Sequence, residues 1–289
     1  MTQTLSLDTP EATLAYDVGG PLPPAAGRPP LMLVGAPMDA GGFAPLASHF
    51  ADRTVVTYDP RGLGRSVRHD GRTEHTPEQN AEDIHRIIGA LGAGPVEMFA
   101  SSGGAVGALA LVAAHPEDVT ILVAHEPPLL TTVPDADRAF AAERGVQAAY
   151  HDKGWGPGMA AFIALTSWQG EFTDDFAAQS TPDPAGFGLP AEDGGSRDDP
   201  LLSGVSNAIT AYRPDFDALA SAPTRVVIAV GAESQGVLTG RSSDATAHAL
   251  NQEATVFPSH HGGFLGGEFG QAGEPEAFAA RLREVLDSR

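Results

Sequence analysis

Short runs of aliphatic and β-branched residues, each followed by a helical segment, constrain the fold of this chain most. Continuous runs of this kind are typical of strands that are buried on both faces of a sheet. Their alternation with helices predicts an α/β fold with a mostly parallel sheet flanked by helices. The strands are expected at residues 31–34, 54–58, 95–99, 119–124, 225–231 and 254–258.

Residues 129–222 interrupt this alternation, because they contain helical patterns but no strand. Aromatic residues in the first half of this stretch argue against a disordered insertion. We interpret it as a helical cap inserted between core strands, which leaves residues 1–128 and 223–289 as the core domain. Its helical segments are expected at 136–149, 159–168 and 174–179, and a loose Pro/Gly/Asp-rich region at 180–200.

The sequence ASSGG at residues 100–104 joins a predicted strand to a helix-like run. The pattern small-x-Ser-x-small is typical of a sharp strand-to-helix turn that exposes a nucleophilic serine. The strained turn requires small residues two positions before and after the serine. Ser102 meets this requirement, whereas Ser101 would have the bulky Phe99 at one of these positions. We therefore favour Ser102 as the nucleophile; a small-residue turn without chemistry is the alternative.

A serine hydroxyl needs a base that removes its proton, and the base in turn needs an acid that orients it. His260 and His261 follow the last predicted strand, and we favour His261 because a Gly-Gly-Phe segment without bulky flanks follows it. Glu126 and Glu233 both follow strands that end at the same edge of the sheet. Two prolines fix Glu126 while Glu233 lies in a flexible loop, so we favour Glu126 and keep Glu233 as the alternative acid.

A tetrahedral intermediate of acyl transfer needs backbone N–H donors for its oxyanion. The amide of Gly103 stands at the start of the helix after the predicted turn and supplies the first donor. The second is expected from the loop after the strand at 31–34, where Pro37 has no N–H. Ala36 is the preferred donor and Met38 the alternative.

The order serine, acid, histidine is that of α/β-hydrolases, and three further segments resemble this family. Residues 34–37 (VGAP) resemble its His-Gly-x-Pro oxyanion segment, with valine in place of histidine. Residues 59–66 (DPRGLGRS) resemble its Asp-x-Arg-Gly-x-Gly-x-Ser loop, and residues 261–264 (HGGF) its His-x-Gly-Phe segment. The resemblance covers almost the whole chain and implies the α/β-hydrolase fold.

A closer likeness is to the zearalenone hydrolases, which open a macrocyclic lactone. They have a serine pair at the turn, offset by one residue from the pair found here, and a Cys-His-Glu-Leu-Pro segment after the next strand. Residues 124–128 (AHEPP) are similar to that segment. In that family the glutamate is the triad acid, so the resemblance implies this role for Glu126.

These patterns predict a cofactor-independent serine hydrolase that cleaves a carboxylic ester or lactone through an acyl-enzyme, with a zearalenone-type lactonase as the specific hypothesis. The substrate is expected to be a small apolar molecule, bound with the help of Trp155, Trp168 and Phe172 of the cap. Two alternatives remain open: a C–C bond hydrolase of the same fold, and a weakly catalytic receptor that binds a ligand.

Composition excludes several other classes of function. The formal charge of −20 argues against nucleic acid and anionic membranes as partners. The chain has no cysteine, which removes disulfides and thiolate metal sites, and no metal is expected. It has no apolar run of membrane-spanning length, and its first residues lack the features of a signal peptide. A cytoplasmic location is expected, and a homodimer is left open.

Overall fold

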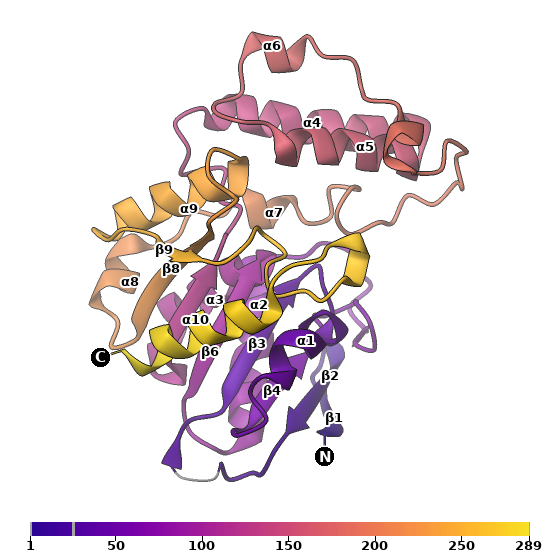
Figure 1. The fold of residues 1–289 in the computed structure, drawn as a ribbon. Helices are drawn as coiled ribbons and strands as arrows, with labels where there is room; N and C mark the ends of the chain where they lie inside the picture. Colours follow the sequence, from indigo (N-terminus) through magenta and orange to yellow (C-terminus); the bar gives the residue numbers. More distant parts are fainter. Residues whose placement is uncertain (1, 25–26, 289) are drawn as a thin grey trace.

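The computed structural model describes residues 2–24 and 27–288, which form a nine-stranded sheet covered by helices (Figure 1). The strand order is β1-β2-β4-β3-β6-β7-β8-β9, and β5 pairs with β2. The strands from β4 to β9 along this order are parallel, while β1 and β2 form an antiparallel edge. This confirms the predicted, mostly parallel sheet. The strands are β1 (Thr2–Asp8), β2 (Ala12–Gly19), β3 (Leu31–Ala36), β4 (Val55–Tyr58), β5 (Val67–Arg68), β6 (Val96–Ser102), β7 (Val119–His125), β8 (Arg225–Gly231) and β9 (Thr255–Phe257).

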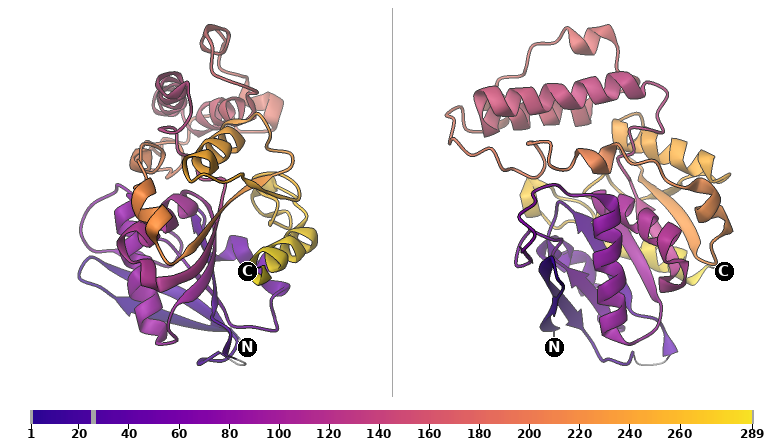
Figure 2. Two further views of the ribbon diagram at one scale, coloured as in Figure 1. Left: turned by 90° about the vertical axis from the view of Figure 1, so that its left-hand side faces the viewer. Right: turned by 180° about the vertical axis from the view of Figure 1, so that it is seen from behind.

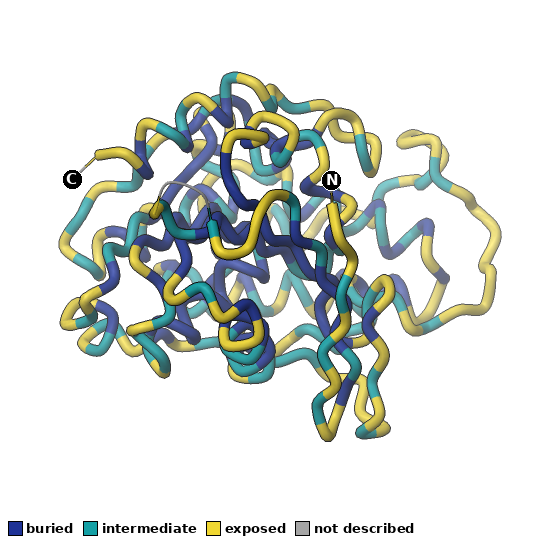
Figure 3. Tube along the Cα trace, turned by 90° about the horizontal axis from the view of Figure 1, so that it is seen from below, coloured by how far each residue is buried: buried dark blue, intermediate teal, exposed yellow. Residues whose placement is uncertain are grey.

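Two apolar layers hold helices on the two faces of the sheet. Figure 2 shows these helices from two further directions. Helices α2, α3 and α8 (Phe216–Ser221) contribute to one layer, and α1 and α10 to the other. Buried residues are concentrated in the sheet and on the inner faces of these helices (Figure 3). The core helices are α1 (Ala44–Ser48), which continues the short helix η2 (Ala40–Phe43), α2 (Pro77–Leu91), α3 (Gly103–Ala114), α9 (Leu238–Ala249) and α10 (Pro275–Asp287).

Helix α2 illustrates how local sequence sets an element of the core. Thr76 accepts a hydrogen bond from the backbone N–H of Gln79 at 3.2 Å, and Pro77 occupies the first turn, where no N–H is required. Ile84 and Ile88 are buried on one side of the helix, as a 3.6-residue period requires. Gly92, in the left-handed conformation, ends the helix.

The insertion at residues 129–222 contains no strand among its residues, all of which the structure describes. Helices α4 and α5 lie side by side above the sheet in the views of Figures 1 and 2, and they have a small apolar core of their own. Helix α8 packs instead against α3, in the layer that covers the sheet. The elements of the insertion are α4 (Ala136–Lys153), α5 (Trp155–Ser167), α6 (Asp174–Ala177), η4 (Pro184–Phe187), α7 (Asn207–Thr210) and α8 (Phe216–Ser221).

Among the described residues, no helix combines the length and the apolar character that a bilayer-spanning segment requires.

Candidate active site

Ser102 is the last residue of β6 and stands directly before α3, in a sharp turn. Its φ of 57° and ψ of −131° are strained for a residue with a side chain. The following glycines let α3 approach β3 closely. A Cβ on Gly104 would lie 2.7 Å from the Cα of Gly35, and a Cβ on Gly103 would lie 2.8 Å from the carbonyl oxygen of Ala36. The ASSGG sequence therefore forms the strained strand-to-helix turn that its small residues predicted.

The two serines of this turn have different environments. Ser102 lines a cavity between the sheet and the inserted helices. Ser101 is only 3% exposed, and its Oγ lies 3.1 Å from Nδ1 of His125, which is completely buried. Only Ser102 of the pair is therefore accessible to a substrate in this cavity.

Glu126 and His261 form a short hydrogen bond, with 2.7 Å between Oε2 and Nδ1. Because an ionised carboxylate only accepts, Nδ1 donates and Nε2 is left as the free nitrogen of the ring. Glu126 is fully buried and accepts two more hydrogen bonds, from the backbone N–H of Gly231 at 2.8 Å and from Oγ1 of Thr239 at 2.6 Å. The carboxylate is therefore fixed in one orientation toward the imidazole.

The surroundings of Glu126 keep it ionised. Burial by itself would raise the pKa of this carboxyl, but the hydrogen bond and positive charge of His261 outweigh burial and hold the pKa well below its ordinary value. The backbone of Glu126 has a φ of 48°, and its N–H donates to the carbonyl oxygen of Ala229 at 3.0 Å. A strained backbone and a buried charge thus coincide at this residue, as is common at functional sites.

The alternative base, His260, is bonded within its own loop. Its Nδ1 accepts a hydrogen bond from the backbone N–H of Gly262 at 3.0 Å, and its Nε2 lies 3.3 Å from the carbonyl oxygen of Ala272. Both ring nitrogens of His260 are therefore engaged, although the residue lines the same cavity as His261.

The alternative acid, Glu233, is exposed at the cavity. Among the described residues, no ion pair or side-chain hydrogen bond joins it to either histidine; its backbone N–H donates to the carbonyl oxygen of Ser259 at 2.9 Å. The structure thus joins Glu126, not Glu233, to His261.

Ser102 and His261 line the same cavity, but they are not hydrogen-bonded to each other in the described part of the chain. Such contacts are often long in a protein without substrate and shorten when the reacting complex forms. The hydroxyl of Ser102 and the imidazole of His261 therefore lie at the same cavity, and we expect the hydrogen bond between them to form when substrate binds.

The expected oxyanion donors lie beside the serine. Ala36 pairs with Ser102 in the register of β3 and β6, and both Ala36 and Gly103 line the cavity. Met38, which is also described, is not among the lining residues; its side chain packs near Gly35. Of the two candidates for the second donor, Ala36 is therefore the one beside the serine.

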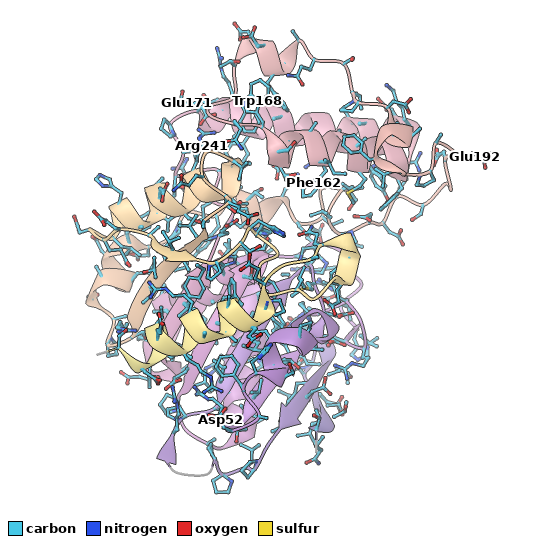
Figure 4. The ribbon with its side chains drawn as sticks, in the orientation of Figure 1. Asp52, Phe162, Trp168, Glu171, Glu192 and Arg241 are labelled. Atoms are coloured by element: carbon cyan, nitrogen blue, oxygen red, sulfur yellow. The ribbon has the colours of Figure 1, made fainter. Side chains whose placement is uncertain are left out.

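The cavity has a volume of about 380 Å³ and lies between the core and α4 and α5. This size suits a small organic ligand. Its walls are largely apolar, and α5 contributes Phe162 and Leu165. Figure 4 shows Phe162 on the side of α5 that faces the core. The other apolar lining residues include Pro60, Leu63, Pro128, Leu130, Val146, Leu201, Ile209, Val237 and Leu238.

Trp155, Trp168 and Phe172, which we expected to bind substrate, do not line this cavity. Trp155 is at the surface, where its Nε1 donates to Asp199 at 2.9 Å. Trp168 lies beyond the end of α5, away from Phe162 (Figure 4), and Phe172 is buried in the separate apolar core of the insertion. Trp168 and Phe172 pack instead on Phe176, within the apolar cluster of the insertion.

Sequence reasoning missed Phe162, Glu143 and Thr239. Phe162 and Leu165 follow a helical spacing, so a helical-face analysis of the segment 159–168 would have found this wall. The position of Thr239 depends on how α9 packs on the end of β7, which no local pattern reveals.

The candidate site contains no group of three metal-ligating side chains among the described residues. One such group, His85, His115 and Asp118, is found elsewhere, on α2 and after α3.

Comparisons with known proteins agree with this architecture. Residues 29–156 match the family model described as "alpha/beta hydrolase fold". The chain is 29% identical to "Uncharacterized hydrolase YraK" of Bacillus subtilis over 287 residues, which cover 98% of this chain and 95% of that protein. It is also 36% identical to a proline iminopeptidase of Xylella fastidiosa over 100 residues, which cover 34% of this chain and 31% of the relative.

Solved structures show the same fold along nearly the whole chain. A thermophilic esterase from Thermogutta terrifontis superposes with a TM-score of 0.64 at 21% identity, covering 98% of both chains. Naproxen esterase from Bacillus subtilis superposes with a TM-score of 0.63 at 16% identity, covering 99% of this chain and 92% of the other. The chain therefore has the α/β-hydrolase fold.

Proposed function

We propose that this protein is a serine hydrolase that cleaves a carboxylic ester or lactone through an acyl-enzyme. The observation that carries the proposal is the 2.7 Å hydrogen bond between buried Glu126 and His261, at a cavity that Ser102 also lines. A buried, ionised acid that fixes an imidazole beside a serine on a strained turn is the arrangement that activates a serine nucleophile.

In the proposed reaction, His261 Nε2 takes the proton of Ser102 while Oγ attacks the acyl carbon. The backbone N–H groups of Gly103 and Ala36 stabilise the oxyanion, and Glu126 stabilises the imidazolium. His261 then protonates the leaving alcohol, which departs and leaves the acyl-enzyme. A water molecule, deprotonated by the same imidazole, releases the acid and restores Ser102.

The apolar walls of the cavity favour an apolar acyl or alcohol group, and its volume accommodates a small ester. Two esterases among the similar folds and the AHEPP segment at residues 124–128 make ester and lactone cleavage the reactions to test first. We propose that residues 129–222 act as a cap, since α4 and α5 supply one wall of the cavity.

Turnover of p-nitrophenyl butyrate by the purified chain tests this proposal. Ser102→Ala is expected to lower kcat by a factor on the order of 10⁶, as removal of a triad serine does. Ser101→Ala serves as the matched control and is expected to retain catalysis, because Ser101 does not line the cavity. Unchanged turnover in Ser102→Ala would reject the proposal, and binding without any turnover would favour a receptor.

A further inference from the structure

The titratable side chains that line the cavity are two carboxylates and three histidines, His75, His260 and His261. Glu143 of α4 and Glu233, which follows β8, both line it. No arginine or lysine is among the lining residues, all of which belong to the described part of the chain. A ligand in this cavity therefore meets carboxylates on two walls and no guanidinium or ammonium group.

Glu143 is the more confined of the two carboxylates, because it is partly buried whereas Glu233 is exposed. Burial raises the pKa of Glu143, and a hydrogen bond from Thr210 and the charge of Arg144 offset this only in part. No ion pair involving Glu143 is found among residues 2–24 and 27–288. A partly buried carboxylate without a bound cation is destabilising, and a cation beside it would relieve that cost.

The neighbours of Glu143 in the cavity are also polar. Gln147, one helical turn further along α4, donates from Nε2 to Oδ1 of Asn207 at 2.6 Å. Both of these residues line the cavity, as does Thr210. Gln147, Asn207 and Thr210 are neutral, so Glu143 is the one ionisable side chain of this group. We use "polar wall" below for Glu143, Gln147, Asn207 and Thr210.

We propose that the polar wall selects substrates that carry a protonated amine on the group held in the cavity, and discriminates against substrates that carry a carboxylate there. The inference rests on the proposed ester hydrolysis for its kinetic test. An attractive ion pair for one class and like-charge repulsion for the other both contribute to such discrimination.

The kinetic test compares three p-nitrophenyl esters of similar chain length: caproate, ε-aminocaproate and the adipate monoester. The ratio of kcat/KM for the ammonium ester to that for the carboxylate ester is expected to be at least on the order of tenfold. Glu143→Gln is expected to reduce this ratio severalfold. A wild-type ratio near one, or a ratio that Glu143→Gln leaves unchanged, overturns the inference even if the neutral ester is hydrolysed.

The matched control is Glu192→Gln, which removes the same charge from an exposed loop at the far end of the insertion (Figure 4). Glu192→Gln is expected to leave the ratio of kcat/KM values for the ammonium and carboxylate esters unchanged. If it reduced this ratio as much as Glu143→Gln does, the effect would come from net charge rather than from the polar wall, and the inference would be contradicted. If no ester is hydrolysed, the proposed function fails, and calorimetry with hexylammonium and hexanoate then decides this inference separately. Tighter binding of hexylammonium supports it; equal or weaker binding overturns it.

A different observation concerns a histidine and carboxylate cluster outside the cavity. His85 Nδ1 lies 2.6 Å from Oδ2 of Asp118, and His115 Nε2 lies 2.8 Å from Oε1 of Glu82. The two imidazole rings stack with their centroids 3.8 Å apart. One ligand atom from each of His85, His115 and Asp118 lies within 4.8 Å of the others.

This set of nitrogen and oxygen donors matches the preferences of Zn²⁺ and neighbouring divalent transition metals. Tetrahedral coordination with bonds of about 2 Å requires ligand atoms roughly 3.3 Å apart. Because the two ring planes are nearly parallel, at 10°, one imidazole must turn about its side-chain torsions before both rings point a nitrogen at a shared ion. Glu82 is then placed to orient His115 or to complete the coordination. We infer that this cluster binds a divalent transition-metal ion and links α2 to the end of α3.

Calorimetry with ZnCl₂ tests this second inference without reference to catalysis. Wild type is expected to bind one Zn²⁺ and to gain thermal stability, and His85→Ala/His115→Ala is expected to lose both effects. His248→Ala, which removes an exposed histidine of α9, is the control and is expected to retain them. Absence of binding by wild type, or equal binding by the double variant, overturns the inference.

Discussion

His261 Nδ1 donates a hydrogen bond of 2.7 Å to Oε2 of Glu126, which directly follows β7 and lies 135 residues earlier in the chain. β7 is the strand next to β6, which carries Ser102 at its end. The candidate acid Glu126 therefore follows the strand next to the serine strand, whereas the exposed Glu233 follows β8, the next strand in the sheet. This relationship has direct consequences for activity.

Replacing the two glutamates separates their roles. Glu126→Gln is expected to lower kcat on a p-nitrophenyl ester by about 10⁴, because the imidazole loses its orienting charge and correct tautomer. Glu233→Gln is expected to change kcat on the neutral ester far less, since no side-chain contact joins it to His261. A greater loss in Glu233→Gln than in Glu126→Gln would assign the acid to the other strand.

The glycine after the serine turn is required by the packing of α3. A methyl group in Gly104→Ala would lie 2.7 Å from Gly35 Cα and 2.8 Å from the carbonyl oxygen of Val34. The substitution is expected to lower the free energy of unfolding by about 1–3 kcal/mol and to reduce activity, because Ser102 is displaced. Urea denaturation of the purified variant measures the first effect.

Gly89 of α2 provides the matched control. A Cβ at this exposed position meets nothing within 4 Å, and its φ is not positive. Gly89→Ala is expected to stabilise the protein by about 0.5–1 kcal/mol, since alanine favours a helix interior. Equal effects of the two substitutions would contradict the steric argument.

The burial of His125, next to Ser101, predicts that the free energy of unfolding depends on pH. Complete burial lowers its pKa to about 4, against the attraction of Glu126, which raises it. An unfolded histidine titrates near about 6.5. Between these values the unfolded chain binds a proton that the folded chain does not, so stability falls as pH drops from about 6.5 to about 4, by roughly 3 kcal/mol.

The variant His125→Gln isolates this contribution. The variant is expected to be less stable than wild type near neutral pH, because it loses the contact with Ser101. Its free energy of unfolding is expected to fall less than that of wild type as the pH is lowered, because the contribution of His125 is absent. Urea denaturation of both proteins at several pH values between about 4 and 7 measures the difference. Parallel slopes would show that His125 does not titrate as its burial requires.

Because Phe162 of α5 lines the cavity, we expect its replacement to change the KM for ester substrates. Phe162→Ala is expected to raise KM for esters with long acyl chains by roughly tenfold, because it removes an aromatic face from the cavity. Trp168→Ala is expected to lower thermal stability with little change in KM, since Trp168 packs on Phe176 instead. The reverse pattern would restore Trp168 as a substrate-binding residue.

Much of this fold could be predicted from local pattern. The aliphatic runs identify the strands because strands buried on both faces carry continuous apolar sequence, and the sequence ASSGG identifies the strained turn because only small residues fit around it. The pairing of Glu126 with His261 was favoured from the rigidity of the AHEPP segment, since the two prolines fix the chain after β7.

The residues that line the cavity were harder to predict. Trp155 and Trp168 are large and apolar, but whether such a side chain faces a cavity or packs within a layer depends on the tertiary rotation of its helix. The same holds for Glu143, whose place in the cavity follows from how α4 lies on the core. These relationships are set by long-range packing and leave no pattern in the neighbouring sequence.

The most direct test of the account is covalent labelling of the serine pair with a p-nitrophenyl organophosphate. Intact mass and fragment-ion spectra should show one adduct on Ser102 in wild type and in Ser101→Ala, and no adduct in Ser102→Ala. An adduct on Ser101, or labelling that persists in Ser102→Ala, would contradict the assignment of Ser102 as the nucleophile.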